Sequence, residues 1–305
     1  MYSQPGNPFS GCIFRYRSVN ECNLNALEKN RLYFSTPENF NDPYDNLLYV
    51  NLEEICCNIW GNLCIGMDSY IEKISKTHSV EAFITHEFWN GTNQQLIVNE
   101  HLNNVCMCVD HIKKSIRHNV KIICFSEVYD SILMWSHYAN NHQGYILVYD
   151  IDDLKSADRY ASESLSINNK TRLEKVSYVT RQIDLTDDVE NFVRYNMLET
   201  LGDIKPPPFS ISQYTLRQAI SQKSIEWRYE QEWRLIPRVI DLQNESPLTY
   251  ISCMPKAVIL GAQCNLKDSE QITSIARNIH LPIYRMSLNE YTPTYQLEIL
   301  ALDNI

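Results

Sequence analysis

The residues best suited to chemistry are two glutamates, Glu230 and Glu232, in the segment Trp227-Arg-Tyr-Glu-Gln-Glu-Trp-Arg-Leu235. The segment alternates as a strand does, with aromatic and aliphatic residues on one side and the two glutamates, flanked by Arg228 and Arg234, on the other. Residues two apart on a strand are roughly 6.6 Å apart, so we expect the carboxylates side by side between guanidinium groups. This row is either a functional face or a solvated strand face held by local ion pairs.

Acidic side chains also bind metal ions, so metal-dependent hydrolysis of nucleic acid is an alternative chemistry. The carboxylates that could form such a set are Asp42, Asp45, Glu127, Glu230 and Glu232. Two His and two Cys also lie within residues 101–111, but Cys-x-Cys is not the usual zinc spacing, and a helix would point these side chains apart. Outside the hydrolysis alternative, we therefore expect no metal ion.

The segment Thr36-Pro-Glu-Asn-Phe-Asn-Asp-Pro-Tyr-Asp45 is a candidate binding loop. Asn41 and Asp42 can satisfy backbone donors locally, and Pro43 fixes the direction of the chain after them. The loop is either a rigid structural clasp or a loop that holds a ligand.

A short helix is expected within residues 132–144, between two strands. Its Trp135 is of a type that packs in cores, and His137 is either a hydrogen-bonded structural residue or, with Tyr138, part of a pocket wall. His137 and His142 are five residues apart, which does not match the spacing of a helical metal pair.

The elements that must position these residues alternate between strands and helices. Strands are expected at 12–18, 31–35, 120–129, 145–149, 176–179, 227–235, 256–261, 283–286 and, at an edge, 295–300. Helices are expected at 20–30, 189–201, 213–223 and 269–278 and through much of 47–118. The pattern predicts one α+β domain over residues 1–305, with a single mixed β-sheet core, surrounding helices and a helical insertion at about 47–118.

Composition bounds the class of protein. The chain of 305 residues has 44% hydrophobic and 21% charged residues and a net charge of −10, which is typical of a globular protein and disfavours a broad nucleic-acid surface. The start of the sequence lacks the basic and apolar stretches of a secretory signal, and no window is apolar enough to cross a membrane. We therefore expect a cytoplasmic protein with its 10 cysteines reduced and no membrane partner; the oligomeric state stays open.

Three groups of motifs together resemble a bacterial family known as domain of unknown function 2971. They are Phe14-Arg-Tyr-Arg with Tyr33-Phe-Ser-Thr-Pro-Glu-Asn-Phe-Asn-Asp-Pro-Tyr; Cys124-Phe-Ser-Glu with Met134-Trp-Ser-His-Tyr-Ala and His142-Gln-Gly; and Lys223-Ser-Ile-Glu-Trp-Arg-Tyr-Glu-Gln-Glu-Trp-Arg-Leu. The resemblance covers almost the whole chain and is weakest at 47–118. It implies an accessory bacterial protein, with an association to phage-defence neighbourhoods.

A second resemblance is mechanistic. The order of Arg17 on a first strand, a Phe-Ser element at Ser35 or Ser126, and the Glu-x-Glu of Glu230 and Glu232 is similar to that of ADP-ribosyltransferase-like domains. Such enzymes break the bond between nicotinamide and ribose in NAD through an oxocarbenium-like state, which a carboxylate stabilises.

The mechanistic resemblance implies NAD as co-substrate, Glu232 as the catalytic carboxylate, Glu230 as its auxiliary and Arg17 as a cofactor anchor. The expected binding residues are Tyr16, Ser35, Asn41, Asp42, Ser126, Trp135, His137 and Tyr138. The alternative hypothesis is a non-enzymatic sensor or binding module of a defence system, in which the 36–45 loop and the Trp/His/Tyr cluster recognise a nucleotide, a peptide or a phage protein.

Overall fold

The structure is a computed structural model that describes residues 9–55, 58, 92–161, 171–192 and 211–302. The chain divides into two compact units. One consists of Met1–Asp45, His118–Thr180 and Ile220–Ile305, and the other of Asn46–Arg117 and Arg181–Ala219. The second unit thus includes most of the stretch expected as an insertion, together with a later segment that the sequence pattern did not connect with it.

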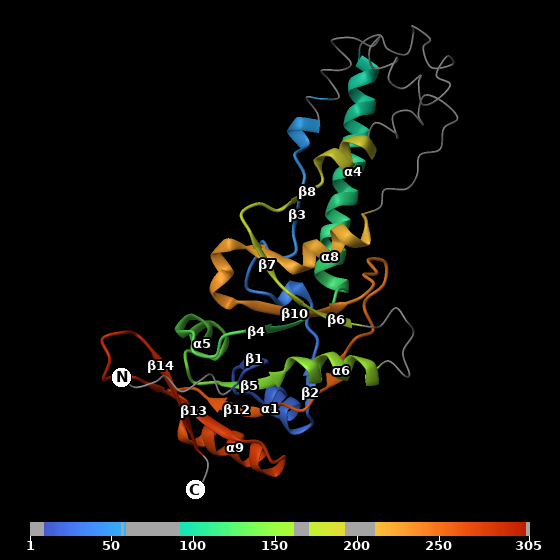
Figure 1. The fold of residues 1–305 in the computed structure, drawn as a ribbon. Coiled ribbons are helices and arrows are strands. Elements are labelled where there is room, and N and C mark those ends of the chain that lie inside the picture. The colour runs from blue at the N-terminus through green and yellow to red at the C-terminus, as the bar shows by residue number, and fades with distance from the viewer. Residues whose placement is uncertain (1–8, 56–57, 59–91, 162–170, 193–210, 303–305) are drawn as a thin grey trace. The chain divides into compact units, whose positions relative to one another are not determined.

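The first unit is built on an eight-stranded mixed sheet (Figure 1). In spatial order its strands are β14 (Leu297–Ala301), β13 (Ile283–Leu288), β12 (Ala257–Leu260), β5 (Tyr145–Asp150), β1 (Cys12–Arg17), β4 (Ile123–Ser126), β10 (Glu232–Pro237) and β6 (Thr171–Lys175). The pair β12–β13 is parallel and the other neighbours are antiparallel. The expected α+β class with a mixed sheet is confirmed.

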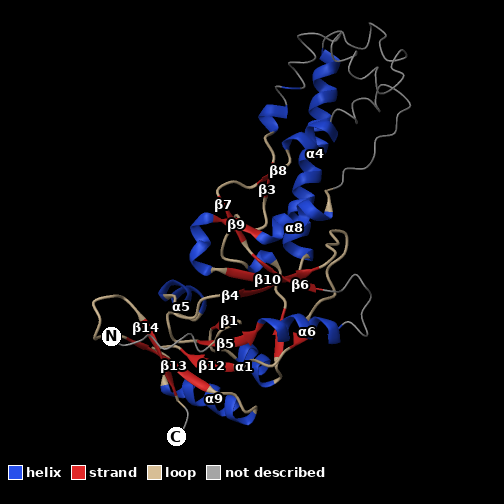
Figure 2. Cartoon of the chain, in the orientation of Figure 1, coloured by secondary structure: helices blue, strands red, loops and turns tan. Residues whose placement is uncertain are grey.

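Helices and strands of the first unit bury two apolar clusters, and β1 contributes to both by alternation. Ile13 belongs to the first cluster, whereas Phe14 and Tyr16 belong to the second. Helices α1 (Glu21–Glu28), α6 (Ile151–Ala161) and α9 (Leu266–Asn278) pack on the first cluster, and α5 (Ile132–Tyr138) packs on the second (Figure 2). Opposite faces of β1 therefore carry the apolar Phe14 and Tyr16 and the two arginines, as the alternation predicts.

Local signals explain where these helices begin. The side chains of Asn20, Ser131 and Asn265 each accept a hydrogen bond from a backbone N–H of the first turn of α1, α5 and α9. Asn30, shortly after α1, takes the left-handed conformation with φ of 52° that terminates many helices.

Smaller elements complete the first unit. A pair of strands, β2 (Arg31–Tyr33) and β11 (Tyr250–Ser252), is antiparallel, and another pair, β7 (Ser177–Val179) and β9 (Gln222–Ser224), is parallel. Two 3-10 helices, η1 (Pro37–Asn39) and η4 (Ile225–Glu230), follow β2 and β9 in the chain.

In the second unit, β3 (Leu48–Tyr49) pairs in parallel with β8 (Ile183–Asp184). Most of α4 (Thr92–Asn119) and of α8 (Gln213–Ser221) belongs to this unit. Much of the helical pattern expected at 47–118, and most of the helix expected at 189–201, lies outside the described residues.

The expected strand over Trp227–Leu235 is wrong in its first half. Residues Ile225–Glu230 form η4, Gln231 is left-handed with φ of 43°, and β10 begins only at Glu232. The alternation of aromatic residues imitates a strand here because Trp227 and Tyr229 pack against each other and against His137. The two glutamates therefore do not stand in a row on one strand.

Candidate functional site

A cavity of about 410 Å³ lies within the first unit, where β1 and β4 separate. Strand β1 pairs with β5 along its whole length but with β4 only at Phe14↔Ser126. Beyond this pair, Arg15–Arg17 of β1 and Cys124 of β4 line the cavity instead of bonding to each other. The volume is within the range of roughly 300–1,000 Å³ that is typical of small-molecule sites.

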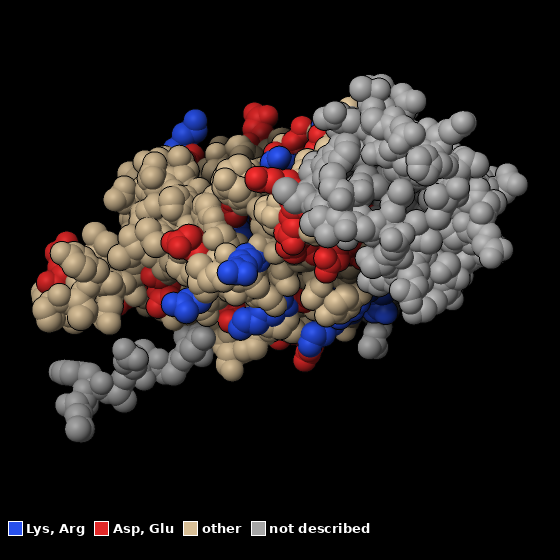
Figure 3. All heavy atoms as spheres, turned by 90° about the horizontal axis from the view of Figure 1, so that it is seen from above, with Lys and Arg blue, Asp and Glu red and all other residues tan. Residues whose placement is uncertain are grey.

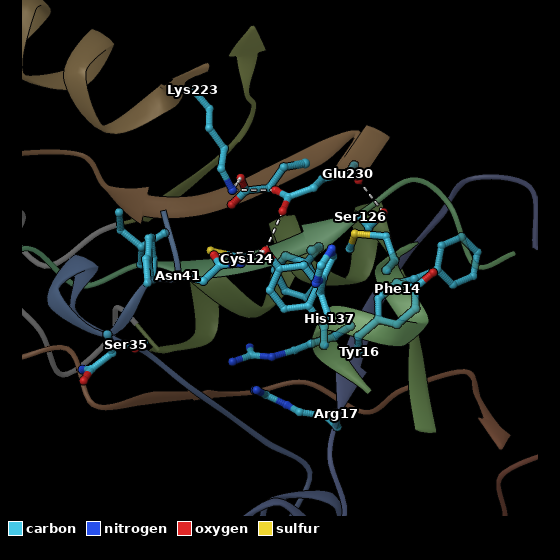
Figure 4. A pocket seen from close by; sticks show the side chains of 18 residues that line it. Phe14, Tyr16, Arg17, Ser35, Asn41, Cys124, Ser126, His137, Lys223 and Glu230 are labelled. Atoms are coloured by element: carbon cyan, nitrogen blue, oxygen red, sulfur yellow. Dashed lines mark hydrogen bonds and ion pairs between the residues drawn. The ribbon is translucent and has the colours of Figure 1, made fainter. Parts of the chain in front are cut away.

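Glu230 and Glu232 lie on one wall of this cavity, and both pair with the same lysine, Lys223 (Figure 4). The Nζ of Lys223 lies 2.6 Å from Oε2 of Glu230 and 3.4 Å from Oε2 of Glu232. The change from η4 to β10 at the left-handed Gln231 brings both carboxylates to this one ammonium group. All three side chains are buried, so their mutual attraction is little screened by water.

Glu232 is the more tightly paired of the two carboxylates. Arg234 binds both of its oxygens, at 2.8 and 2.9 Å, and also donates to Asp45 at 2.6 and 2.9 Å and to the backbone carbonyl of Ile220 at 2.9 Å. Burial raises the pKa of the Glu232 carboxyl, but the charges of Arg234 and Lys223 outweigh burial and lower it to about 2. Glu232 is therefore ionised, and both of its oxygens have partners.

Glu230 is held differently, by a phenol. The hydroxyl of Tyr138 donates to Oε1 of Glu230 at 2.5 Å, and the amide of Asn41 donates to the same hydroxyl at 3.0 Å. Burial raises the pKa of the Glu230 carboxyl, while Lys223 acts in the opposite direction. Burial lowers the pKa of Lys223, but the two glutamates outweigh this and raise it, so the lysine is charged.

Arg15 and Arg17 line the cavity as well. Figure 4 shows Arg17 across the open space from Lys223 and Glu230. Arg15 is 7% exposed, and one of its terminal nitrogens donates to the carbonyl of Tyr33 at 3.0 Å. Burial lowers the pKa of both guanidinium groups. One wall of the site therefore carries two carboxylates and an ammonium group, and a second wall carries the two guanidinium groups.

The two Phe-Ser candidates have different places. Ser126 is buried, and its hydroxyl donates to the backbone carbonyl of Glu230 at 2.5 Å, so it fixes the chain that carries this glutamate. Ser35 lines the cavity near the end of β2, and its backbone bridges Ile122. Tyr16 also lines the cavity, and its hydroxyl donates to the carbonyl of Val128 at 2.8 Å.

The structure places seven of the nine expected binding and anchoring residues, together with both glutamates, in this one cavity and leaves two outside it. Those in the lining are Tyr16, Arg17, Ser35, Asn41, Ser126, His137, Tyr138, Glu230 and Glu232. Trp135 is fully buried in the second apolar cluster, and its indole N–H donates to the carbonyl of Tyr129. Asp42 is buried and does not line the cavity; its carboxylate accepts from the backbone N–H of Tyr44 and so shapes the loop.

Two functional residues were missed by sequence reasoning, although a signal for each was present. Lys223 opens the motif that ends at Leu235, and Arg15 shares a strand face with Arg17. The sequence pattern predicted Arg228 as a cationic neighbour of the glutamates, but Arg228 is exposed. Lys223 is the cation that lies beside Glu230 instead. Asp45, also missed as a partner, is 189 residues away from Arg234 in the chain.

The His142-Gln-Gly144 motif has a structural explanation. Asn140, Asn141 and His142 are all left-handed, with φ between 47° and 66°, and the chain then enters β5, the strand that pairs with β1. A Cβ on Gly144 would lie 2.1 Å from the backbone oxygen of Arg17. Glycine is therefore required here, and the turn supports the strand end from which Arg17 projects.

Among the described residues, no group of three or more His, Cys, Asp or Glu side chains is arranged to hold a metal ion. Of the helices that the structure describes, none is long and apolar enough to cross a membrane.

Neither the curated proteins nor the solved structures contain a significant match to this chain. A family model does match, and it extends from Met134 in α5 to Leu235 in β10. It includes the Met134-Trp-Ser-His-Tyr-Ala, His142-Gln-Gly and Lys223–Leu235 motifs, whereas Phe14-Arg-Tyr-Arg and the 36–45 loop lie outside it. The resemblance predicted from the motifs is thus confirmed for residues 134–235, which match the family described as Protein of unknown function (DUF2971).

Proposed function

We propose that the protein is an ADP-ribosyltransferase-like enzyme that uses NAD in the cavity between β1 and β4. The observation that carries the proposal is that Arg17, Ser126 and both glutamates of Glu-x-Glu, which are far apart in the chain, line this one cavity. A cavity with a carboxylate on one wall and guanidinium groups on the other suits a ligand that develops positive charge at one end and carries phosphates elsewhere.

In this reaction the bond between ribose C1′ and the nicotinamide nitrogen breaks, and its electron pair leaves with neutral nicotinamide. Positive charge then develops on C1′ and the ring oxygen, where an ionised carboxylate stabilises it. Water or an acceptor group attacks C1′ and loses a proton, which Glu230 can accept because burial raises the pKa of its carboxyl.

The geometry favours Glu230 over Glu232 for this role, the reverse of the order that the resemblance implies. Both oxygens of Glu232 are bound by Arg234, whereas Oε1 of Glu230 is bound by the single hydroxyl of Tyr138. We assign Glu232 to holding Lys223 and Arg234 in place. His137, an exposed residue of the lining, is suitably placed as an aromatic wall for a flat ring.

The test is release of nicotinamide from NAD by the purified protein. Glu230→Gln is expected to lower the rate by about two to three orders of magnitude, as loss of a charge-stabilising group does. Glu226→Gln is the matched control, because Glu226 is an exposed residue of the same short helix and is absent from the cavity lining. Release that is undetectable with wild-type protein at saturating NAD, or unchanged in Glu230→Gln, would contradict the proposal.

A nucleotide-binding module without catalysis is the second candidate function. It is favoured by the fact that Lys223 and Arg234 already neutralise the two glutamates, which reduces their field at a ligand. It predicts that NAD binds without being cleaved and that Glu230→Gln leaves its affinity within about twofold. A role in phage defence stays a prediction for either function.

A further inference from the structure

Arg15 and Arg17 form a cationic wall for which the described part of the chain supplies no carboxylate partner. Neither guanidinium makes an ion pair with a carboxylate of the described residues, although buried Lys223 and Arg234 nearby are both paired. Arg15 donates to the Tyr33 carbonyl through one terminal nitrogen, and the other, Nη1, is buried with no hydrogen-bond partner.

The groups that act on the two arginines are not anionic at neutral pH. The pKa of Arg15 is lowered by burial first and by the charge of Arg17 second, and the further influences come from the phenols of Tyr145 and Tyr149 and the thiol of Cys124. Burial raises the pKa of each of these three groups, so they carry no negative charge that could balance the guanidinium pair.

A buried cation beside a second, half-buried cation is costly unless an anion compensates them. Phe125 provides a partial substitute, because the guanidinium carbon of Arg15 lies 5.7 Å from the centre of its ring. This contact does not use the Nη1 donor. The described residues thus leave the Nη1 donor of Arg15 without a partner, and this donor belongs to a residue that lines a cavity large enough for a small molecule.

We infer that Arg15 and Arg17 form the subsite for the diphosphate group of the ligand, with Arg17 in direct contact and Arg15 turning Nη1 onto the anion. This inference rests on the proposed function in the same cavity and adds Arg15, through its buried unpartnered donor, to the residues that hold the diphosphate. A diphosphate diester carries one negative charge on each phosphorus and so matches two guanidinium groups, which bind phosphate oxygens in a fork.

The position of the wall supports this class of ligand. Arg17 lies across the cavity from Glu230 (Figure 4), so a diphosphate bound there directs the attached ribose toward the carboxylate. A simple carboxylate ligand would balance one guanidinium group and leave the other uncompensated.

The inference is tested by calorimetric titration of the full chain with ADP, inorganic pyrophosphate and adenosine. Arg15→Met and Arg17→Met are each expected to weaken ADP and pyrophosphate binding by about ten- to hundredfold and to leave adenosine unaffected. Arg17→Lys keeps the charge but loses the fork, so a smaller, several-fold loss is expected. Arg31→Met is the control, because Arg31 stacks on Tyr250 and is not in the lining.

Two outcomes would overturn the subsite: ADP affinity that is unchanged in both methionine variants, or adenosine that binds as tightly as ADP. Circular dichroism and thermal unfolding establish that each variant is folded, and Arg17→Lys provides the test if a methionine variant is not. Arginine-dependent ADP binding without nicotinamide release would contradict the proposed NAD chemistry and still support the subsite. Nicotinamide release by the wild-type protein, together with unchanged ADP binding in the arginine variants, would support the NAD chemistry and contradict the subsite.

Discussion

Arg15 illustrates at the scale of one residue how a binding site can reduce stability. Its guanidinium is buried, has an unused donor and lies beside a second positive charge. Replacing such a group by an apolar one of similar length removes a desolvation cost and loses one hydrogen bond, to the Tyr33 carbonyl.

We therefore predict that Arg15→Met stabilises the ligand-free protein by about 1–2 kcal/mol while it weakens ADP binding. Urea unfolding with and without ADP measures both effects. A variant that is less stable than wild type in the absence of ligand would show that Arg15 is compensated within the protein.

Glu232 should show the opposite behaviour. Its pKa of about 2 lies below the ordinary value of 4.5, so its contribution to stability is complete above about pH 4.5 and is lost as the pH falls toward 2. We predict that Glu232→Gln loses about 3 kcal/mol at pH 7 and has a flatter stability profile between pH 5 and 2. Urea unfolding across this range is the measurement; parallel profiles for variant and wild type would contradict the assignment.

Tyr138 controls the protonation of Glu230. Its hydroxyl stabilises the ionised carboxylate, so in Tyr138→Phe the pKa of Glu230, already raised by burial, rises further. Nicotinamide release requires ionised Glu230. The acid limb of the pH–rate profile for nicotinamide release should therefore move to higher pH by about one unit in Tyr138→Phe. Tyr16→Phe is the control, because Tyr16 lines the same cavity but donates to a backbone carbonyl. An acid limb that does not move in Tyr138→Phe would exclude Glu230 as the titrating group.

At the scale of elements, the site depends on the place where β1 leaves β4 and on the turn that supports β1. Gly144 of this turn approaches the backbone of Arg17, so Gly144→Ala places a methyl group 2.1 Å from an oxygen that cannot easily move. We predict a loss of at least about 3 kcal/mol in thermal or urea unfolding.

Gly11→Ala provides the comparison for this substitution. Gly11 is left-handed, with φ of 80°, but has open space around it, so only backbone strain of about 1 kcal/mol is expected. Equal losses for the two variants would mean that conformation, and not the close approach to β1, determines the requirement for glycine at 144.

The sequence pattern correctly predicted the strands whose residues are all in the same environment, such as those buried on both faces. Strands β5 and β12 are apolar apart from the terminal Asp150 of β5, and the structure buries nearly all of their residues on both faces. The alternation of β1 likewise separates Phe14 and Tyr16, which pack in the second apolar cluster, from the two arginines. The pattern failed at Ile225–Glu230, where a 3-10 helix presents its aromatic residues to His137 and so produces the same alternation as a strand.

The sequence predicted which residues line the site better than it predicted what each of them does there. Arg17, Ser126 and the glutamates share the cavity, but the pairing of Glu232 with Arg234 and of Arg234 with Asp45 depends on tertiary contacts. No local spacing indicates which carboxylate an arginine 189 residues away will select. For the same reason, the sequence alone could not distinguish Ser126, which fixes a backbone, from a residue that binds a ligand.

At the scale of the whole molecule, the distribution of charge on the protein favours a small nucleotide over a nucleic acid as the ligand. The chain has a net charge of −10, and on the face in Figure 3 the described Lys and Arg side chains lie interspersed with Asp and Glu. The paired cations Arg15 and Arg17 lie instead within a cavity of about 410 Å³. A nucleic-acid backbone needs an extended positive surface, whereas a single diphosphate needs only this wall.

We predict that ADP binds at physiological salt and that duplex and single-stranded DNA do not. Fluorescence anisotropy with labelled oligonucleotides, and competition by ADP, measures both. Micromolar binding of DNA that weakens steeply with salt would show that the protein has a nucleic-acid surface and would favour the alternative of nucleic-acid hydrolysis.

The central claim is that one NAD molecule occupies the cavity, with its diphosphate on the Arg15–Arg17 wall and its nicotinamide ribose at Glu230. The most direct measurement is a crystal structure of the Glu230→Gln protein with NAD, because this variant should bind the dinucleotide and cleave it slowly. We predict diphosphate oxygens within hydrogen-bond distance of both guanidinium groups and ribose C1′ beside the side chain of residue 230. Dinucleotide bound elsewhere, bound with its diphosphate away from both arginines, or absent at saturating NAD would contradict the account.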